Sequence, residues 1–440
     1  MRRTEAAGAA AAVLLVAAAV AVPRLASEAF RMRLVAEAAP LFGRFHPHLG
    51  VGSVPALAIA ALVVCWGPAA VRRSPFGALV AGTAATLAAW SLALGTVGGW
   101  RAFATKLTGY DQYLHEVPRV PGIAVLHVFA RRIPDHQPDS WTVHVSGHPP
   151  GALLTFVALD RIGLGGGTWA ALFCVAVGAS GAAAALIAVR ALAGEAAARP
   201  CAPFLALFPG GLWLAVSGDA YFAGVAAWGL ALLAVAAARR RGARSWLCAG
   251  AAGLLLGWAV FLNYGLVLAA FPALAVLIAA RNLRPLLAAV PAAVVVAGLF
   301  AAGGFWWLDG YHAVMMRYYQ GIASFRPFSY WVWGDLAAAA CAFGPAGGAA
   351  LARAGASLRR PRAAPALAVL VLGAAAAMVA ADLSALSKAE VERIWLPFTL
   401  WVTCGAGLSA PRAPVGATRA WLAVQAVTAL VIAHVVQVYQ

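Results

Sequence analysis

Apolar residues follow one another along this chain in long runs that short polar segments separate. A helix needs about 20 mainly apolar residues, within a range of roughly 17–25, to cross the hydrocarbon core of a membrane. The candidate runs are 7–24, 54–71, 78–97, 168–192, 200–217, 219–238, 245–259, 261–280, 285–305, 330–351, 364–383, 394–410 and 419–438. Because the run 245–259 is short, the pattern predicts 12 or 13 transmembrane helices. No internal repeat of the kind found in many transporters is visible.

The longest polar segment divides the chain into three expected parts. These are N-terminal transmembrane helices over 1–97, an outer loop with interfacial helices over 98–167, and a transmembrane bundle over 168–440. Loops longer than about 12–15 residues are usually functional or disordered, and this one is aromatic and varied enough to be ordered. Its stretch GIAVLHVFARRI is amphipathic and predicts a surface helix with Arg131 and Arg132 at the lipid headgroups.

Composition agrees with a membrane protein. The chain is 63% hydrophobic and 11% charged, whereas soluble domains carry about 25% charged residues. The fold class predicted is therefore an all-α polytopic membrane bundle. The net charge of +17 could indicate a nucleic-acid partner. The arginines instead lie in clusters between apolar runs, as expected for loops that orient membrane helices, so no nucleic acid is predicted. The six cysteines lie in or beside apolar runs and indicate packing.

The distribution of arginines predicts which ends of the helices face the cytoplasm. The N-terminus resembles a signal peptide that remains uncleaved as the first helix, with Arg2 and Arg3 inside. Alternation then places further arginines inside: Arg72, Arg73, Arg190, Arg199, Arg239, Arg240, Arg241, Arg244, Arg281, Arg284, Arg353, Arg359, Arg360, Arg362, Arg412 and Arg419. The rule holds only if 148–163 does not cross the membrane. This segment is short and interrupted by Asp160–Arg161, so we expect an interfacial helix.

The same alternation places the acidic residues, which were not used to set it. Only Glu5 and Glu195 fall inside. The others fall at the outer ends: Glu28, Glu37, Asp111, Glu116, Asp135, Asp139, Asp160, Asp219, Asp309, Asp335, Asp382, Glu390 and Glu392. Most histidines lie in the first two outer loops. The pattern predicts a multi-pass protein of the cell membrane with its reaction or binding site on the extracytoplasmic face. The alternative is that outer loops are simply longer and more polar.

Four segments contain candidate site residues. In HVSGHPPGALL, Pro149–Pro150 predicts a helix start that directs His148 to a helix N-terminus, which favours phosphate; a water-facing capping histidine is the alternative. Asp219 opens a span, where it could bind substrate or cap a helix. Tyr264, between two spans, could line the same cavity or belong to a tight turn. The stretch DLSALSKAEVERIWLPF places Lys388, Glu392 and Arg393 at the entrance to a span.

Arginine suits bidentate phosphate binding, so Arg393 is predicted to bind an anionic substrate together with Lys388. Snorkelling to the interface, with Glu390 or Glu392 as partner, is the alternative. The aromatic segment FWWLDGYH (305–312) is expected to be a short loop between spans with tryptophans at the membrane interface.

The order of these motifs resembles a known family. An acid near tyrosines (Asp111 in GYDQYL), HPPG at 148–151, SGDAYF around Asp219 and the late EVERIWLPF are similar to motifs of the GT-C superfamily of integral membrane glycosyltransferases. That group includes protein mannosyltransferases and the aminoarabinose transferase, and the chain looks closest to actinobacterial members. The likeness covers the chain in order, although each motif is short.

The resemblance implies a donor, a base and a mechanism. The donor would be a polyprenyl-phosphate sugar reached from the bilayer, and the acceptor a glycan, lipid or protein. Asp111 would be the general base, and Arg393, with His148 or Lys388, would neutralise the leaving phosphate while the anomeric carbon inverts. Three spans precede the long loop, and the acid pair expected there appears as Asp111–Gln112. Glu116 is therefore a rival base, and Asp135 or Asp139 could also serve.

The sequence is also compatible with a bound cation and with a different function. A divalent cation could be held by Asp111, Glu116 and a histidine, and no metal ligand is assigned. A transporter or flippase of a lipid-linked envelope intermediate is the competing function, and it predicts charges at mid-membrane depth. Most charges of this sequence lie near the outer ends of the runs, which favours the enzyme.

Overall fold

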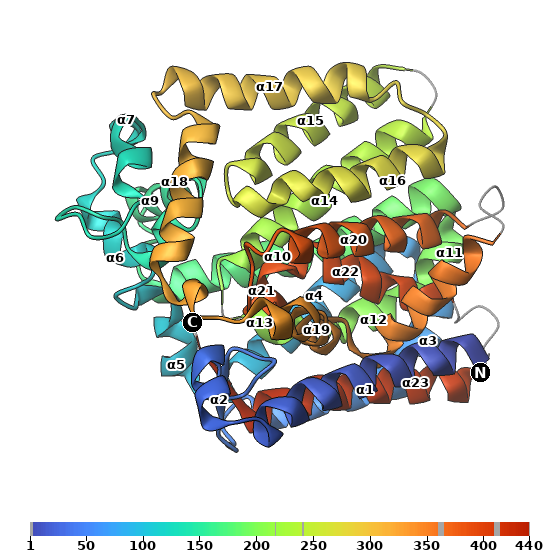
Figure 1. Cartoon of the computed structure of the whole chain (residues 1–440). Coiled ribbons are helices and arrows are strands. Elements are labelled where there is room, and N and C mark those ends of the chain that lie inside the picture. Colours follow the sequence, from blue (N-terminus) through green and yellow to red (C-terminus); the bar gives the residue numbers. More distant parts are fainter. Residues whose placement is uncertain (1–2, 216, 240–241, 360–364, 409–413, 440) are drawn as a thin grey trace.

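The computed structural model describes residues 3–215, 217–239, 242–359, 365–408 and 414–439. Within these ranges the regular elements are helices, apart from one short pair of strands (Figure 1). Nine helices of this described part are long and apolar enough to cross a membrane. They are α1 (Arg3–Leu25), α3 (Ser53–Arg73), α4 (Phe76–Gly95), α10 (Gly167–Ala193), α14 (Asp219–Ala238), α15 (Ala243–Val260), α19 (Phe328–Ser357), α20 (Ala366–Leu383) and α23 (Val415–Val435). The prediction of an all-α polytopic membrane protein is confirmed.

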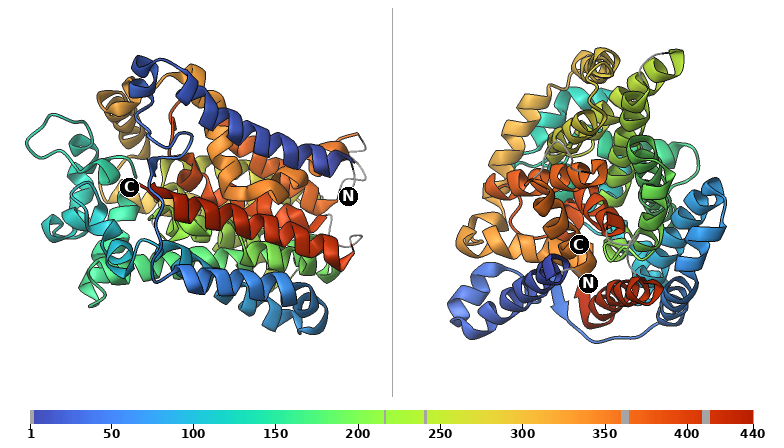
Figure 2. Two further views of the ribbon diagram at one scale, coloured as in Figure 1. Left: turned by 90° about the horizontal axis from the view of Figure 1, so that it is seen from below. Right: turned by 90° about the vertical axis from the view of Figure 1, so that its right-hand side faces the viewer.

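Three further predicted runs form shorter apolar helices. They are η6 (Tyr264–Ala269) with α16 (Ala270–Ala280), α17 (Leu286–Ala302), and α22 (Leu396–Cys404) with η9 (Gly405–Leu408). The most buried helices, α10, α14 and α19, lie at the centre of the bundle, where alanine and glycine allow close packing. The long helices run side by side along one common direction, as two further views show (Figure 2).

The run 200–217 is not one helix, so this part of the prediction is wrong. It forms the short pieces η5 (Arg199–Cys201), α12 (Ala202–Ala206) and α13 (Gly211–Leu214). Pro209 has no N–H to continue a helix, and Gly210 follows it directly. Tertiary contacts replace the lost helical hydrogen bonds. The Trp90 indole N–H donates to Phe208 O at 3.1 Å, and Gly210 N–H donates to Ala342 O at 2.8 Å. An irregular backbone is tolerated in the membrane only with such partners.

The segment 305–312 is not a short loop either. After Gly303–Gly304 the chain turns by 74° into the amphipathic helix α18 (Trp307–Gln320), which crosses one end of the bundle (Figure 1). There α18 contacts the long loop. Arg317 forms an ion pair with Asp135, and the Gln320 side-chain oxygen accepts from Asp135 N–H at 2.7 Å.

The loop 98–167 folds into short helices and helical turns. They are α5 (Trp100–Thr105), η1 (Lys106–Thr108), α6 (Tyr113–Glu116), η2 (Val117–Arg119), η3 (Ile123–Val125), α7 (Leu126–Phe129), η4 (Ala130–Arg132), α8 (Val143–Ser146) and α9 (Pro150–Arg161). The start of α9 at Pro150 matches the prediction from the double proline. The stretch 122–133 is broken into three turns, and the Arg132 guanidinium lies 3.4 Å from the ring centroid of buried Trp141. It does not form the single surface helix that the sequence suggested.

The remaining short elements join the ends of the helices. They are α2 (Glu28–Leu34), α11 (Glu195–Ala198), η7 (Ile322–Ser324), α21 (Val391–Ile394), β1 (Gly43–Phe45) and β2 (Val436–Val438). Strands β1 and β2 pair antiparallel and connect the segment after α2 to the end of α23. A Cβ at Gly43 would lie 2.6 Å from Gln437 O, so the close approach of the two strands requires glycine.

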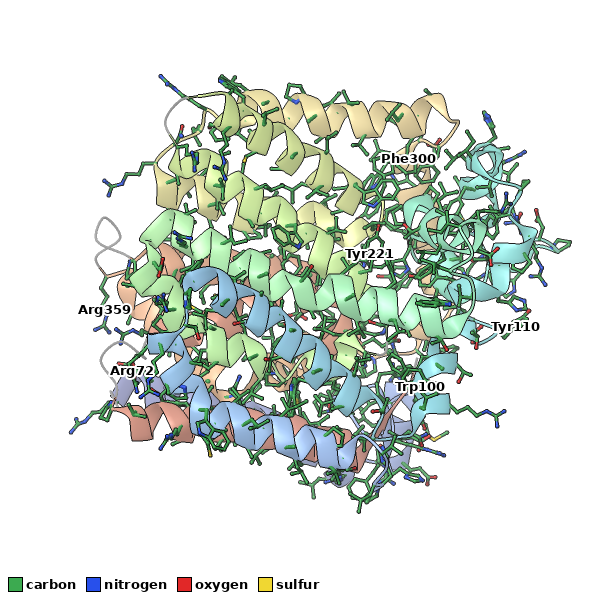
Figure 3. The ribbon with its side chains drawn as sticks, turned by 180° about the vertical axis from the view of Figure 1, so that it is seen from behind. Arg72, Trp100, Tyr110, Tyr221, Phe300 and Arg359 are labelled. Atoms are coloured by element: carbon green, nitrogen blue, oxygen red, sulfur yellow. The ribbon has the colours of Figure 1, made fainter. Side chains whose placement is uncertain are left out.

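The two ends of the bundle differ in charge. Figure 3 shows Arg72 and Arg359 at one end, called here the basic end, and Trp100 and Tyr110 at the other, the site end. The two acids predicted to be cytoplasmic pair with arginines. Glu5 contacts Arg353 at 2.7 Å, and Glu195 contacts Arg199 at 2.6 Å. Arg2, Arg240, Arg241, Arg360, Arg362 and Arg412 of the predicted clusters lie outside the described residues.

Candidate functional site

A buried arginine between two carboxylates is the centre of the site end. Arg393 of α21 donates from Nη1 to Asp219 Oδ2 at 2.6 Å and from Nη2 to Glu390 Oε2. Arg393 is 6% exposed and Asp219 is 2% exposed. A charge removed from water to this extent is tolerated only with partners. Asp219 is the first residue of α14, where the helix dipole favours a negative charge.

The turn before α21 places Glu390 against this arginine. Ala389 and Glu390 both have left-handed backbones, with φ values of 69° and 67°. The Ala389 N–H donates to Asp335 Oδ1 of α19 at 2.9 Å, which holds the turn. Because Glu390 is the N-cap of α21, Arg393 follows three residues later on the same side of this turn.

A second buried arginine, Arg326, supports the same turn. Its Nη1 donates to Lys388 O at 2.7 Å and lies 3.4 Å from Glu390 Oε1. Its Nη2 donates to Val35 O at 3.3 Å. Lys388 Nζ in turn donates to Arg326 O at 3.1 Å. Arg326, which lies in the segment before α19, is thus joined to the turn before α21 and to the N-terminal segment. Its positive charge lies beside that of Lys388.

The long loop covers the Asp219–Arg393 pair and leaves a small pocket beside it. The pocket is lined by Gln112, Tyr113, His144, Ser217, Gly218, Asp219 and Arg393. The Tyr113 hydroxyl lies 2.9 Å from His148 Nδ1, and the same nitrogen lies 2.8 Å from His144 O. His148, which precedes α9, is 8% exposed. The structure therefore contradicts the alternative of a water-facing capping histidine.

Burial and neighbouring charges set the protonation of these groups. Burial, with a contribution from Arg393, lowers the pKa of His144 to about 3. Burial also lowers the pKa of His148. Burial alone would raise the pKa of Glu390, but Arg393 and Arg326 outweigh it and lower the pKa to about 2. At neutral pH both histidines are therefore uncharged and Glu390 is ionised.

The two candidate bases occupy different environments. Asp111 is exposed, and its backbone oxygen accepts from His144 N–H at 3.0 Å, beside the pocket-lining residues. Glu116 is 1% exposed. Its Oε1 accepts from Thr142 N–H at 3.2 Å, and its Oε2 lies 3.5 Å from Arg119. Glu116 therefore connects two turns of the loop, and it does not line the pocket.

The remaining predicted residues are distributed around the network. Lys388 lies within it, as described, with its Nζ 5.6 Å from the ring centroid of Tyr319. Glu392 is 1% exposed and accepts from Phe42 N–H at 2.9 Å, so it holds the N-terminal segment. Tyr264 packs against Trp307 of α18, with 5.4 Å between the ring centroids, and does not line the small pocket. The structure thus brings together His148, Asp219, Lys388 and Arg393.

Several contacting residues were not singled out from the sequence. These are Gln112, Tyr113, His144, Ser217 and Arg326. Glu390 was named only in the alternative interpretation of Arg393, as the partner of a snorkelling arginine, and the structure pairs it with Arg393. The spacing of His144 and His148, four residues apart, is the signal that could have indicated their contact. Nothing in the local pattern separates Arg326 from other loop arginines.

The placement of the acids also bears on a bound cation. Among the described residues, no group of three or more histidine, cysteine, aspartate or glutamate side chains could hold a metal ion. The ligands considered from the sequence were Asp111 and Glu116 with a histidine. In the structure Asp111 is exposed, whereas Glu116 is buried against Thr142 and Arg119. These residues do not fit a metal site.

Comparison with known proteins shows similarity of structure alone. No protein-family model and no curated protein matches the sequence. The oligosaccharyltransferase of Archaeoglobus fulgidus in its apo form aligns with a TM-score of 0.50 and 12% identity, over 82% of this chain and 56% of that chain. ArnT from Cupriavidus metallidurans bound to undecaprenyl phosphate aligns with a TM-score of 0.45 and 18% identity, over 67% and 56%.

A further archaeal structure gives a similar result. AglB from Archaeoglobus fulgidus, in complex with an inhibitory peptide and a dolichol-phosphate, aligns with a TM-score of 0.47 and 14% identity, over 82% of this chain and 56% of that chain. This chain thus spans little more than half the length of the proteins it matches. At these identities the likeness is one of fold alone, and it is to the oligosaccharyltransferase of Archaeoglobus fulgidus that the alignment reaches a TM-score of 0.50.

Proposed function

We propose that this protein is a membrane glycosyltransferase, a hexosyl- or pentosyltransferase that moves a sugar from a polyprenyl-phosphate carrier to a hydroxyl of a glycan, lipid or protein. The reaction takes place at the site end, which faces the outside of the cell. The observation that carries this proposal is the buried Arg393, held by Asp219 and Glu390 beneath the loop that contains Asp111, in a fold similar to that of an oligosaccharyltransferase. Asp219 is the first residue of α14, so the charged pair of Asp219 and Arg393 lies at the end of a long helix. Transporter sites lie near the midplane of the bilayer.

Two buried N–H groups support phosphate binding here. Arg393 Nε and Arg326 Nε have no hydrogen-bond partner within the described residues. Leaving a buried donor unpaired is costly, so a phosphate oxygen that accepts from it stabilises the complex. Arg393 is the residue that we assign to the carrier phosphate, with Lys388 and His148 as neighbours that help to orient it. Fixed positive charge acts most strongly on a leaving phosphate where water is excluded.

The exposed Asp111 is the base that we assign. It removes the proton of the acceptor hydroxyl, whose oxygen attacks the anomeric carbon. The bond from that carbon to the phosphate oxygen breaks, and the carrier phosphate leaves with the electron pair. Attack from the face opposite the phosphate inverts the anomeric centre. The other acids have structural partners. Glu116, the rival base, accepts a hydrogen bond from Thr142 N–H, and Asp219 and Glu390 are paired with Arg393.

The test compares sugar transfer by variants of the full-length protein in membranes. A panel of radiolabelled polyprenyl-phosphate sugars is supplied as donor, and labelled product is measured. We expect Asp111→Asn to lower the rate by about 10²–10⁴-fold, the usual contribution of a general base. Arg393→Lys keeps the charge and loses the two-carboxylate geometry, so we expect a loss of about 10²–10³-fold.

Matched controls separate the base from a general effect on the loop. Asp139→Asn removes another acid of the same loop, whose side chain is 66% exposed, and should leave transfer unchanged. Glu116→Gln should retain most of the activity in protein that stays folded. Wild-type transfer that survives both Asp111→Asn and Arg393→Lys would remove the assignment. Absence of transfer with every donor of the panel would contradict the proposed function.

A further inference from the structure

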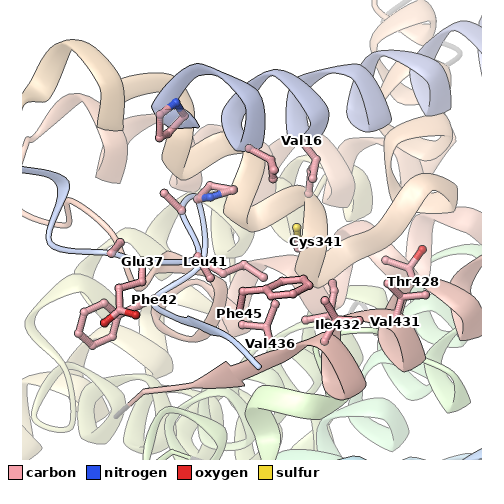
Figure 4. Close-up of a pocket in the computed structure, with 18 of the residues that line it drawn as sticks. Val16, Glu37, Leu41, Phe42, Phe45, Cys341, Thr428, Val431, Ile432 and Val436 are labelled. Atoms are coloured by element: carbon pink, nitrogen blue, oxygen red, sulfur yellow. The ribbon is translucent and has the colours of Figure 1, made fainter. Parts of the chain in front are cut away.

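An apolar groove lies apart from the charged network, between α1, α19 and α23 (Figure 4). Its volume of about 1170 Å³ exceeds the roughly 300–1,000 Å³ of pockets for drug-sized ligands. Most of its lining is alanine, valine and other aliphatic side chains, among them Val16 of α1 and Val431 and Ile432 of α23. A cavity of this size and composition suits a long hydrocarbon chain.

The groove occupies only the half of the bundle next to the site end. On α1 it begins at Ala12, in the middle of the helix, and extends to Arg24 near the end of that helix. On α23 it extends from Ala423 to Val435, again from the middle to the site end. The lining valines Val13 and Val431 are more than half exposed, at 52% and 53%. They therefore face the bilayer, at the depth of the lipid chains of one leaflet.

A kink in α19 shapes the inner wall of the groove. Gly344 has a φ of 68° and is followed by Pro345, which interrupts the helix. The Gln425 side chain of α23 satisfies the freed backbone, because its Nε2 donates to Phe343 O at 2.9 Å and its Oε1 accepts from Ala346 N–H at 3.1 Å. A built-in kink with its own polar partner is a fixed feature of the wall.

Positive charge lies at the mouth of the groove. Arg24 and Arg31 line it at the site end, and both are exposed. One acid, Glu37, is also there and accepts from the Tyr439 hydroxyl at 3.0 Å. Two arginines at the level of the lipid headgroups attract anionic lipids.

The groove is separate from the reaction centre. Within the described residues, Arg326, Lys388 and Arg393 do not line it. The segment 34–42 lies between the groove and the reaction centre. Its Phe42 N–H donates to Glu392 at 2.9 Å, and the Phe42 ring centroid is 5.2 Å from the Arg326 guanidinium. A lipid in the groove therefore keeps its head at Arg24 and Arg31 and does not present it to Arg393.

We propose that this groove binds a hydrocarbon chain of an anionic phospholipid from the leaflet at the site end, with the lipid phosphate at Arg24 and Arg31. This site is additional to the proposed transferase function and does not depend on it. The bound lipid supports the segment 34–42, which holds Glu392 and Arg326. The lipid composition of the membrane thereby affects the stability of the site end.

The test measures lipid binding to the purified full-length protein by native mass spectrometry. Phosphatidylglycerol is the anionic probe and phosphatidylcholine the zwitterionic one. We expect one tightly bound phosphatidylglycerol. Val16→Trp and Val431→Trp fill the groove from opposite walls and should abolish this binding. Val294→Trp adds the same bulk on the lipid-facing side of α17, where Val294 is 61% exposed, and should leave binding intact.

A second set of variants tests the head group. Each arginine near a lipid headgroup contributes about fivefold, so Arg24→Gln with Arg31→Gln should weaken phosphatidylglycerol binding by about 25-fold and leave phosphatidylcholine unchanged. Arg72→Gln with Arg73→Gln at the basic end is the control. Equal binding by the groove-filling variants and Val294→Trp would overturn the proposal. So would a polyprenyl phosphate that outcompetes phosphatidylglycerol and is lost in Val16→Trp, because the groove would then be a carrier site.

Discussion

At the residue scale, the site depends on buried charges that compensate one another. Arg393 has two carboxylate partners, Asp219 and Glu390, and neighbouring Arg326 shares Glu390. The low pKa of His144 keeps its ring uncharged, so it adds no positive charge beside Arg393. Removing one member of such a set leaves its partners charged and buried, which costs more than the pair contributes.

This compensation predicts an order of stability among variants. Arg393→Met leaves the buried Asp219 without a cation, while Glu390 keeps Arg326, so we expect a loss of roughly 3–5 kcal/mol in the free energy of unfolding. Asp219→Asn leaves Arg393 paired with Glu390 and should cost clearly less. Thermal and denaturant unfolding of the purified protein in detergent measures both. Equal losses would show that the two carboxylates do not share the arginine.

At the element scale, the site is assembled from the ends of elements and not from their middles. Asp219 begins α14, Glu390 caps α21, and His148 precedes α9. The N-terminal segment is attached through Glu392, whose Oε1 accepts from Phe42 N–H. Burial raises the pKa of Glu392 to about 7, although the bond to Phe42 opposes the shift. This contact between α21 and the N-terminal segment therefore titrates near neutral pH.

The raised pKa predicts a pH dependence of stability. The folded state binds the Glu392 proton more tightly than the unfolded state, whose pKa is 4.5. The contribution of Glu392 is therefore fully present below about pH 4.5 and is lost as the pH rises through about 7, by roughly 3 kcal/mol in total. Glu392→Gln should remove this loss. The free energy of unfolding of the variant should therefore fall less than that of wild type between about pH 5 and pH 8.

The matched control for this measurement is Glu28→Gln, which changes an exposed glutamate of α2. Unfolding of wild type and of both variants is followed at about pH 5 and pH 8 in the same detergent. For each protein, the change in the free energy of unfolding between the two pH values is compared. Glu28→Gln should behave like wild type. A Glu392→Gln protein with the pH dependence of wild type would show that Glu392 is not the titrating group.

At the scale of the whole molecule, charge separates the two ends of the bundle. Arg72 and Arg359 lie at the basic end and Tyr110 at the site end (Figure 3). Glu5 and Glu195, the two acids predicted to be inside, pair with Arg353 and Arg199. Positive loops remain in the cytoplasm, so we infer that the site end faces outward.

Cysteine labelling of intact cells tests this orientation. In a variant without the native cysteines, Asp111→Cys should react with a membrane-impermeant maleimide added outside. Arg72→Cys, also at an exposed position, should react only after the membrane is permeabilised. Reaction at position 72 with none at position 111 would reverse the orientation and remove the outward-facing site.

The sequence by itself determined the class of the protein and much of its layout. Hydrophobic length alone specifies a helical membrane bundle, because a spanning helix satisfies its own backbone hydrogen bonds. The start of α9 at Pro150 is equally local, since proline sets the backbone of its own position and of the residue before it. Residue chemistry at helix ends was enough to single out Asp219 and Arg393, which the structure joins in one buried ion pair.

Only the tertiary structure decided which side chains meet. The pairing of Arg393 with Asp219 joins residues 174 positions apart, and Arg326 was not distinguishable because its partners lie on two other segments, the turn before α21 and the N-terminal segment. The break in the run 200–217 and the bend of 74° before α18 were also not predicted from the sequence. At the break, neighbouring helices supply hydrogen bonds to the interrupted backbone, and these partners are distant in the sequence. Hydropathy reports transfer into lipid one residue at a time, whereas the site depends on contacts between residues that are distant in the sequence.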